Sequence, residues 1–400
     1  MKIVIAPDSF KESLSALQVA SAVEAGFREV FPQARIVKVP VADGGEGTVQ
    51  ALMDATGGTR RSVEVVGPEG TLVQAAYGLC LQSGLAVIEM AAASGLELVP
   101  PARRDPRSAT SFGTGQLIRD ALEAGARHFV IGIGGSATND GGAGMLQALG
   151  VRLLDAQGRE LDRGGAALAR LARIDASGLD ARIAQCRIDV ACDVTNPLLG
   201  PQGASAIFGP QKGATPAMVQ ELDGCLRCLA EVLQCDLGQD VAGVPGSGAA
   251  GGLGAALLAV LGGRLRPGCE VVMDTIGLEG LLDGADLVIT GEGRTDGQTA
   301  YGKAPIGVAR VAARCGVPVV ALSGALTPES AAVHEHGIAA VFSAVRRPCS
   351  VEEALRDAAA NVRSAAYNLA SVLKLGMGLR SGGAISPDAG LVRVRAPAGT

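Results

Sequence analysis

The chain has 400 residues, of which 48% are hydrophobic and 19% charged, so it is long enough to form two globular domains with large apolar cores. Its formal net charge is only −5 and its aromatic content 2%, a composition that argues against nucleic acid as a partner. The longest apolar stretch, residues 249–261, is shorter than the roughly 20 residues of a membrane span, so we expect no membrane partner either.

The N-terminal segment alternates strand and helix. An apolar run at 2–6, which ends before a proline, predicts a buried strand, and apolar residues at helical spacing over 14–27 predict a helix. A second strand at 35–39, a glycine-rich loop and a helix near 48–56 follow. This order is typical of the opening of a doubly wound parallel sheet.

The pattern changes near residue 61, where tight turns begin to connect the strands. Such turns cannot join parallel strands, so a different sheet is expected, and it begins as an antiparallel meander. The predicted meander strands are 61–66, 71–79 and 85–90. The elements expected after them are a helix near 115–125, strand 128–133, a helix from about 141, strand 187–192, and helices near 216–234 and 249–262.

Strand and helix alternate again from residue 285 onward. The expected strands are 285–290, 317–323 and 339–343, and the expected helices are 303–315, 328–336 and 351–373. The simplest topology is a Rossmann- or flavodoxin-like α/β domain made of residues 1–61 and 284–375, with a mixed α/β domain, residues 62–283, inserted into it. Residues 376–400 have the composition of an unpacked, flexible tail.

Nine cysteines are scattered along the chain. Their number is odd, and the N-terminal apolar run is too short for a signal peptide, so reduced thiols in a cytoplasmic protein are the simplest interpretation. Cys225 and Cys228 lie inside a helical pattern, which favours core packing over metal binding.

Five loops combine glycine with charged residues, and four of them directly follow predicted strands, whose carboxyl ends carry the ligands of α/β sheets. They are residues 7–11, 42–48, 132–144, 192–197 and 290–298. The third loop joins a strand to a helix, so its backbone N–H groups can hold an anion; a tight turn that uses glycine only for its geometry is the alternative. Its phosphate-binding candidates are Gly134, Gly135, Ser136, Asn139, Gly141 and Gly142.

Lysines and carboxylates supply the charged candidates. Of only six lysines in the chain, Lys11, Lys212 and Lys303 lie in or beside glycine-rich loops, where an ammonium group can bind phosphate or carboxylate. A solvated surface is the alternative for each. Carboxylates in the loops can hold Mg²⁺ or accept a proton, with helix capping as the alternative for the two that precede helices. They are Asp8, Asp43, Glu46, Asp140, Asp193, Glu292 and Asp296.

Histidine is scarce, with three residues in the whole chain. A zinc site with histidine ligands or a Ser-His-Asp triad therefore has almost no material. The remaining means of catalysis is the positioning of carboxylates, lysine, arginine and backbone amides, which suits phosphoryl transfer.

Seven motifs, in order over residues 1 to about 375, resemble those of the bacterial glycerate kinase family, type 1. They are APDSFKESLSA at 6–16, ADGGEGT at 42–48, GGSATNDGGAGML at 134–146, NPLLG at 196–200, FGPQKG at 208–213, GEGRTDGQT at 291–299 and GKAPIGVA at 302–309. The resemblance implies ATP-dependent phosphorylation of D-glycerate with Mg²⁺, commonly to 2-phosphoglycerate. It also implies a flavodoxin- or Rossmann-like domain together with a second α/β domain.

The resemblance does not supply a role for each residue, so the following roles are hypotheses. The site is expected in a cleft between the domains, where the loop 134–142 holds the ATP phosphates and Asp193, with Asp140, holds Mg²⁺. Domain closure is expected to keep water from the γ-phosphate. The catalytic candidates are Asp8, Lys11, Arg294 and Asp296. The substrate-binding candidates are Ser9, Lys11, Asp43, Glu46, Glu292 and Arg294.

Within these sets some assignments stay open. Lys11 and Arg294 bind either the glycerate carboxylate or the transferring phosphoryl group, and either Asp8 or Asp296 accepts the hydroxyl proton. Asp43 and Glu46 either complete the metal site or hold Lys11. A nicotinamide-dependent 2-hydroxy-acid dehydrogenase is one rival, although the first strand is not followed by the GxGxxG of such enzymes. A non-catalytic sugar-acid-binding protein is the other. The protein is expected to be a monomer or a homodimer.

Overall fold

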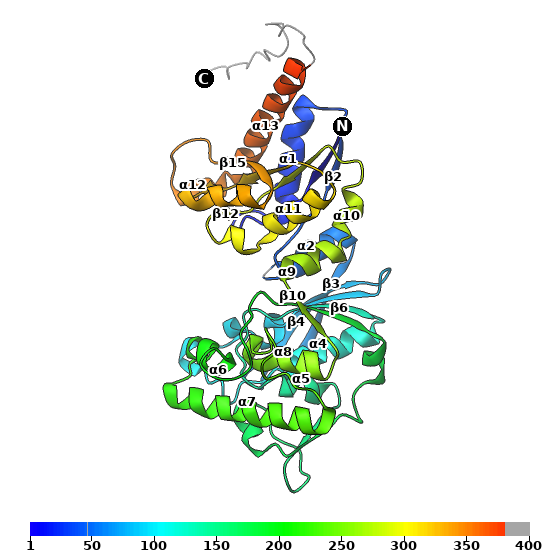
Figure 1. Cartoon of the computed structure of the whole chain (residues 1–400), viewed down its shortest axis with the longest axis vertical. Helices are drawn as coiled ribbons and strands as arrows, with labels where there is room; N and C mark the ends of the chain where they lie inside the picture. The colour runs from blue at the N-terminus through cyan, green and yellow to red at the C-terminus, as the bar shows by residue number, and fades with distance from the viewer. Residues whose placement is uncertain (46, 381–400) are drawn as a thin grey trace.

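Two sheets organise the chain, and Figure 1 shows each of them in its own lobe. The computed structural model describes residues 1–45 and 47–380. The first sheet contains five parallel strands in the order β15 (Ile338–Ser343), β13 (Val319–Ser323), β11 (Leu287–Thr290), β1 (Lys2–Ile5) and β2 (Arg35–Lys38). It therefore joins both ends of the sequence in one parallel sheet, and the predicted α/β fold class is confirmed.

Strand β1 is buried on both faces, so its side chains alternate between two apolar clusters. Ile3 and Ile5 belong to the cluster that contains α1 (Ala16–Val30) and α13 (Ala358–Arg380). Val4 points the other way, into the cluster that contains α11 (Ala304–Arg314). Helices thus cover both faces of the sheet, as a doubly wound fold requires.

The second sheet is mixed. Its strand order is β10 (Arg264–Arg266), β9 (Arg187–Ala191), β6 (His128–Gly132), β5 (Leu85–Glu89), β4 (Leu72–Cys80) and β3 (Thr59–Val66). Strands β3 to β5 form the predicted antiparallel meander, and β5, β6, β9 and β10 are parallel. The α-helices of this lobe include α3 (Ala91–Ser94), α4 (Phe112–Glu123), α5 (Ala143–Ala148), α6 (Ala204–Phe208), α7 (Pro216–Leu237) and α8 (Ala249–Ala259).

Three helices connect the two sheets: α2 (Thr48–Thr56), α9 (Gly268–Thr275) and α10 (Leu278–Leu281). Leu52 of α2 and Val272 of α9 share one apolar cluster with Val4 of the first sheet and with Val87 and Val130 of the second. One continuous core therefore reaches from sheet to sheet. The limits of the two domains at residues 61 and 284 stay a prediction.

The C-terminal region departs from the predicted pattern. The single helix expected at 351–373 is two helices, α12 (Val351–Arg356) and α13, and the segment expected to be a helix at 328–336 is a 3₁₀ helix. Residues 376–380, which composition assigned to the tail, belong to α13. Their two glycines weaken a helix by only about 1 kcal/mol each, so they do not end it. The rest of the predicted tail, 381–400, lies outside the described residues.

The structure bears on two further predictions, those for the cysteines and for a membrane span. All nine cysteines are free thiols. Within residues 1–45 and 47–380, no helix is both long and apolar enough to cross a lipid bilayer. Cys225 is 2% exposed and lies in the core of the second lobe, as predicted.

Gly26 allows α1 and α13 to approach closely. A Cβ atom there would lie 2.3 Å from the carbonyl oxygen of Arg363 and 2.8 Å from the backbone nitrogen of Tyr367. We expect Gly26→Ala to lower the free energy of unfolding by about 1–3 kcal/mol, because two helix backbones must separate. Gly224 of α7 has open space around it, so Gly224→Ala should raise stability by about 1 kcal/mol. Urea-unfolding midpoints measure both; equal shifts in one direction would contradict the packing argument.

Candidate active site

Charged loops from three neighbouring strands of the first sheet meet at its carboxyl edge. Asp8 follows β1, Asp43 follows β2, and Glu292 follows β11. The backbone N–H of Asp8 donates to the carbonyl of Gly291 at 2.8 Å, which fixes two of these loops to each other. A cavity of about 670 Å³ opens here. Its lining includes eight residues that the sequence singled out: Asp8, Ser9, Lys11, Asp43, Glu292, Arg294, Asp296 and Lys303.

Asp8 is the carboxylate whose protonation is most perturbed in this cavity. Burial raises its pKa to about 7, and the nearby charges of Asp43 and Glu292 add to the increase. The backbone N–H of Ser9 donates to Asp8 Oδ1 at 2.6 Å and partly opposes it. A carboxyl group with a pKa near 7 can both accept and release a proton at neutral pH.

Asp296, the other predicted base, has the opposite environment. Desolvation acts to raise its pKa, but the Arg294 side chain, the Gln298 backbone N–H and the charge of Lys303 together lower it. Arg294 Nη2 lies 2.9 Å from Asp296 Oδ2, and Lys303 Nζ lies 3.7 Å from Asp296 Oδ1. Asp296 is thus held as an anion, which makes it a weaker base than Asp8 and a positioning group for two cations.

Glu292 connects the cations to the sheet. It is 7% exposed, and its Oε1 accepts a hydrogen bond from the Thr299 hydroxyl at 2.5 Å. Its Oε2 lies 3.6 Å from Lys303 Nζ. Burial raises the pKa of Glu292, while Thr299 and Lys303 oppose the increase. Glu292 and Asp296 therefore hold the Lys303 ammonium between them, at the edge of the cavity.

The loop that carries Asp43 lies against the carboxyl ends of two strands of the second sheet. Gly44 has a φ of +95°, and a Cβ atom there would lie 2.6 Å from the Cα of Gly268 and 3.0 Å from the Cβ of Ala191, where β9 ends. A Cβ on Gly132, where β6 ends, would lie 3.0 Å from the Gly44 carbonyl oxygen. Glycine at both positions is what allows this approach. The predicted phosphate loop therefore begins beside the Asp43 loop.

Asp193 lies on the second sheet's side of this contact, which we call the junction of the two sheets. It follows β9, and its Oδ1 accepts a hydrogen bond from the Gly268 backbone N–H at 2.8 Å. Burial raises its pKa, and the charge of Asp43 raises it further. Asp43 and Asp193, one from each sheet, therefore form a carboxylate donor set that a divalent cation would stabilise.

Whether these residues fit Mg²⁺ is a question of ligand number. Among residues 1–45 and 47–380, no three His, Cys, Asp or Glu side chains are placed to hold a metal ion together. In phosphoryl-transfer sites, however, Mg²⁺ usually takes one or two carboxylates and completes its shell with water and substrate phosphates. The oxygen donors of Asp43 and Asp193 fit that pattern.

Asp140, the second predicted metal ligand, lies in the protein interior with 0% exposure. Its Oδ2 accepts from the backbone N–H and the hydroxyl of Ser111, both at 2.8 Å, and from the Gly144 N–H at 3.2 Å. Its Oδ1 accepts from the Gly142 N–H at 3.1 Å. Burial raises its pKa against these hydrogen bonds. With its oxygens engaged in joining two loops, this geometry favours a structural role.

The predicted phosphate loop has an exposed part and a buried part. Gly134 and Gly135 are exposed, whereas Asn139, Gly141 and Gly142 are buried. A Cβ on Gly141 would lie 2.2 Å from the Leu229 side chain, so this part packs against α7. The phosphate role of all six candidates stays a prediction, and the geometry favours Gly134 and Gly135 for it, because Ser136 is also buried and its hydroxyl accepts a hydrogen bond from Lys212.

Sequence reasoning left some residues of the junction out. Thr299 lies within the GEGRTDGQT motif, so that motif could have indicated its hydrogen bond to Glu292. Lys303 and Lys212 were noted but given no role; both line cavities. Glu89 had no sequence signal: it lies at the end of β5, and its Oε1 accepts from the Val49 backbone N–H at 3.0 Å, near the start of α2. Glu46 lies outside the described residues.

The chain is similar to known proteins over nearly its whole length. Residues 3–374 match the Glycerate kinase family. The chain belongs to the glycerate kinase family. The glycerate 2-kinase of Escherichia coli (strain K12) is 57% identical to it over 377 residues, which are 94% of this chain and 99% of the relative. The glycerate kinase of Bacillus subtilis (strain 168) is 53% identical over 375 residues, 94% of this chain and 98% of the relative.

A solved structure agrees with this membership of the glycerate kinase family. A crystal structure from Salmonella typhimurium LT2, described provisionally as glycerate kinase 2, matches with a TM-score of 0.88 and 59% sequence identity, over 94% of this chain and 99% of that chain. The family resemblance inferred from the motifs is confirmed. As a member of the glycerate kinase family, the chain is an enzyme, a kinase.

Proposed function

We propose that this kinase transfers the γ-phosphoryl group of ATP to D-glycerate, giving 2-phosphoglycerate, in the cytoplasm. The observation that carries the substrate assignment is the near full-length identity to relatives named glycerate kinase and, in one case, glycerate 2-kinase. The cavity at the first sheet supports it, because carboxylates and cations occur there together, as direct phosphoryl transfer requires.

In this proposal Asp8 accepts the proton of the attacking hydroxyl group, since its pKa of about 7 suits a base at neutral pH. Lys11, Arg294 and Lys303 bind phosphate oxygens, and Glu292 and Asp296 position the last two. Ser9, beside Asp8, contributes a hydroxyl group to the bound substrate.

Asp43 and Asp193 would hold Mg²⁺, which supplies positive charge to the phosphate oxygens when it is bound. Because these two carboxylates belong to different sheets, binding at them would also draw the two lobes together. The backbone N–H groups of Gly134 and Gly135 are then available to the phosphates from the side of the second lobe. Closure of the lobes would exclude water from the reacting phosphoryl group.

The test is turnover with defined reactants. Purified protein with ATP, Mg²⁺ and D-glycerate should release ADP, and NMR of the product should place the phosphate on the 2-hydroxyl; L-glycerate is the stereochemical control. Product phosphorylated at the 3-hydroxyl would refute that regiochemistry alone. Binding of D-glycerate without ADP release would indicate a sugar-acid-binding protein, and reduction of a nicotinamide cofactor would indicate a dehydrogenase.

A further inference from the structure

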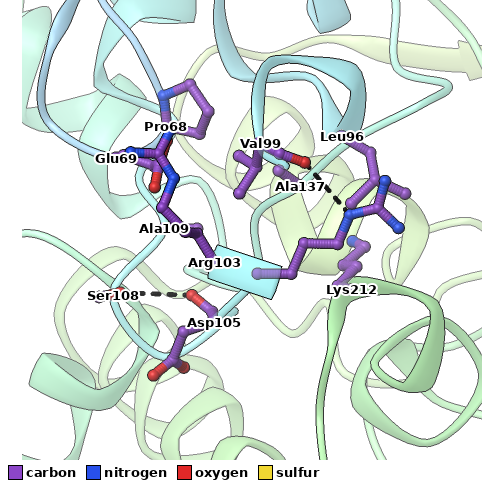
Figure 2. A pocket seen from close by; sticks show the side chains of 11 residues that line it. Pro68, Glu69, Leu96, Val99, Arg103, Asp105, Ser108, Ala109, Ala137 and Lys212 are labelled. Atoms are coloured by element: carbon purple, nitrogen blue, oxygen red, sulfur yellow. Dashed lines mark hydrogen bonds and ion pairs between the residues drawn. The ribbon is translucent and has the colours of Figure 1, made fainter. Parts of the chain in front are cut away.

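A second, smaller pocket lies in the second lobe and takes no part in the proposal so far. Its volume is about 180 Å³, against about 670 Å³ for the cavity at the first sheet. Figure 2 shows Lys212 beside Leu96 and Ala137, with Pro68 and Glu69 on the opposite side of the pocket. The walls therefore combine apolar side chains with a buried cation.

Lys212 is 2% exposed, which is rare for a lysine. Its Nζ donates to Ser136 Oγ and to the Thr138 carbonyl, both at 2.7 Å. Two of its three N–H donors are thereby used within the protein. Burial lowers the pKa of Lys212 to about 7, against the charge of Asp140. An anion in the pocket would restore the charged form.

The other charged groups of the pocket show which cations lack an anionic partner. Glu69 is paired with Arg103 at 3.1 Å, and Asp105 is paired with Arg107 at 2.7 Å. Arg104 donates only to backbone carbonyls, those of Val99 at 3.3 Å and Gln211 at 3.4 Å. In the part of the chain that the structure describes, the ion pairs within 4.0 Å include neither Arg104 nor Lys212.

Size decides which anion fits. Pockets for drug-sized ligands have volumes of about 300–1,000 Å³, a range that contains the larger cavity and excludes the smaller one. A three-carbon hydroxy acid is far smaller than a nucleotide. The pocket also adjoins the exposed start of the phosphate loop, because the Leu96 backbone N–H donates to the Gly135 carbonyl at 2.8 Å and Ser136 binds Lys212.

We propose that this pocket binds the carboxylate of the acceptor acid, with Lys212 and Arg104 as its cationic partners, and that the larger cavity receives the nucleotide. This inference rests on the proposed function and makes it more specific. It assigns the carboxylate to the second lobe and leaves Lys11 and Arg294 for phosphate, a choice that the sequence left open. The acceptor and the nucleotide would then approach each other from opposite lobes, and Asp8 would reach the hydroxyl group next to the bound carboxylate when the lobes close.

The test separates the two substrates kinetically. Arg104→Gln and Lys212→Met should each raise the KM for D-glycerate by about 10- to 100-fold, the effect of losing a hydrogen bond to a charged group, with the KM for ATP changed less than twofold. Arg107→Lys is the control: position 107 does not line the pocket, and lysine keeps a cation beside Asp105, so both KM values should stay at the wild-type level. Thermal unfolding identifies any loss of fold in Lys212→Met. Arg104 is only partly buried, so Arg104→Gln is expected to fold and tests the pocket even if Lys212→Met does not fold.

Three outcomes would overturn the proposal: an unchanged KM for D-glycerate in both pocket variants, an increase confined to the KM for ATP, or an equal increase in the Arg107 control. Calorimetric titration of D-glycerate without ATP distinguishes this failure from failure of the proposed function. If the wild type binds the acid without turnover, and binding is lost in Arg104→Gln and kept in Arg107→Lys, the pocket assignment is supported and the kinase assignment is refuted. Wild-type protein that neither binds nor phosphorylates D-glycerate contradicts both.

Discussion

Replacement of Asp8 by asparagine is expected to lower kcat by about 10²- to 10⁴-fold, the usual contribution of a general base. Asparagine keeps the size of the side chain and its ability to accept the Ser9 hydrogen bond, but it cannot take up the hydroxyl proton. Steady-state kinetics with saturating substrates measures the effect. Asp162→Asn is the control, since Asp162 is 86% exposed and pairs with Arg170, so its kcat should match the wild type.

The pH profile separates Asp8 from its rival. The base must be ionised to act, so with Asp8 in this role kcat should rise with pH up to its pKa of about 7 and then level off. Asp296 has a lowered pKa, so as the base it would give a flat profile over the same range.

Ionised Asp8 is also unfavourable in the folded state, because its folded pKa exceeds the unfolded value and stability decreases as pH rises through that interval. Asp8→Asn should therefore be at least as stable as the wild type at pH 8. A flat pH profile of the wild-type kcat, together with an active Asp8→Asn variant, would exclude Asp8 as the general base.

The fold could be predicted because its signals are local. Buried strands such as 2–5 end at turn residues, and the tight turns after residue 66 can only form an antiparallel meander. Where the sequence reasoning failed, the reason was a long-range contact. Residues 249–259 contain a kink at Ala250, Gly251 and Gly252, all with positive φ. A Cβ on Gly251 would lie 2.0 Å from the Thr138 carbonyl oxygen, a contact that no local pattern reveals.

The candidate site shows the same division. That Asp8, Asp43 and Glu292 gather at one edge follows from parallel strands, whose carboxyl ends lie together. The environment of each carboxylate does not follow. Asp140 stands in a motif as rich in glycine as any other, yet it is enclosed by residues from the loop before α4. Asp8 and Asp296 differ because burial raises the pKa of Asp8, whereas Arg294, together with Gln298 and Lys303, lowers the pKa of Asp296.

Lys212 illustrates why burial matters more than residue type. A lysine beside glycine reads equally well as a surface residue or as a ligand for an anion. The structure places it in a 3₁₀ turn that ends at Gly213, whose φ is +92°, and a Cβ there would lie 2.5 Å from the Arg104 carbonyl oxygen. The two cations proposed to bind the carboxylate thus lie on segments whose backbones are in contact, although 108 positions in the chain separate Arg104 from Lys212.

The Mg²⁺ requirement should respond to Asp43 and Asp193 and not to Asp140. We expect Asp43→Asn and Asp193→Asn each to raise the Mg²⁺ concentration for half-maximal activity by at least about tenfold and to lower kcat/KM by about 10²-fold, since each removes one charged oxygen ligand. Because both side chains act on one ion, the double variant should lose less than the product of the single losses. Titration of activity with Mg²⁺ at fixed ATP measures all three.

Asp140→Asn provides the contrast, because the sequence predicts Asp140 as the second Mg²⁺ ligand. Its NH2 group would replace one carboxylate oxygen and would face either the Gly142 donor or the donors of Ser111 and Gly144, so stability should fall by about 1–3 kcal/mol. Its Mg²⁺ half-saturation should stay at the wild-type value. The reverse pattern, in which Asp140→Asn shifts the Mg²⁺ titration and Asp193→Asn leaves it unchanged, would mean that the interior loop opens to bind the ion. The carboxylates at the junction of the sheets would then serve only to hold the lobes in place.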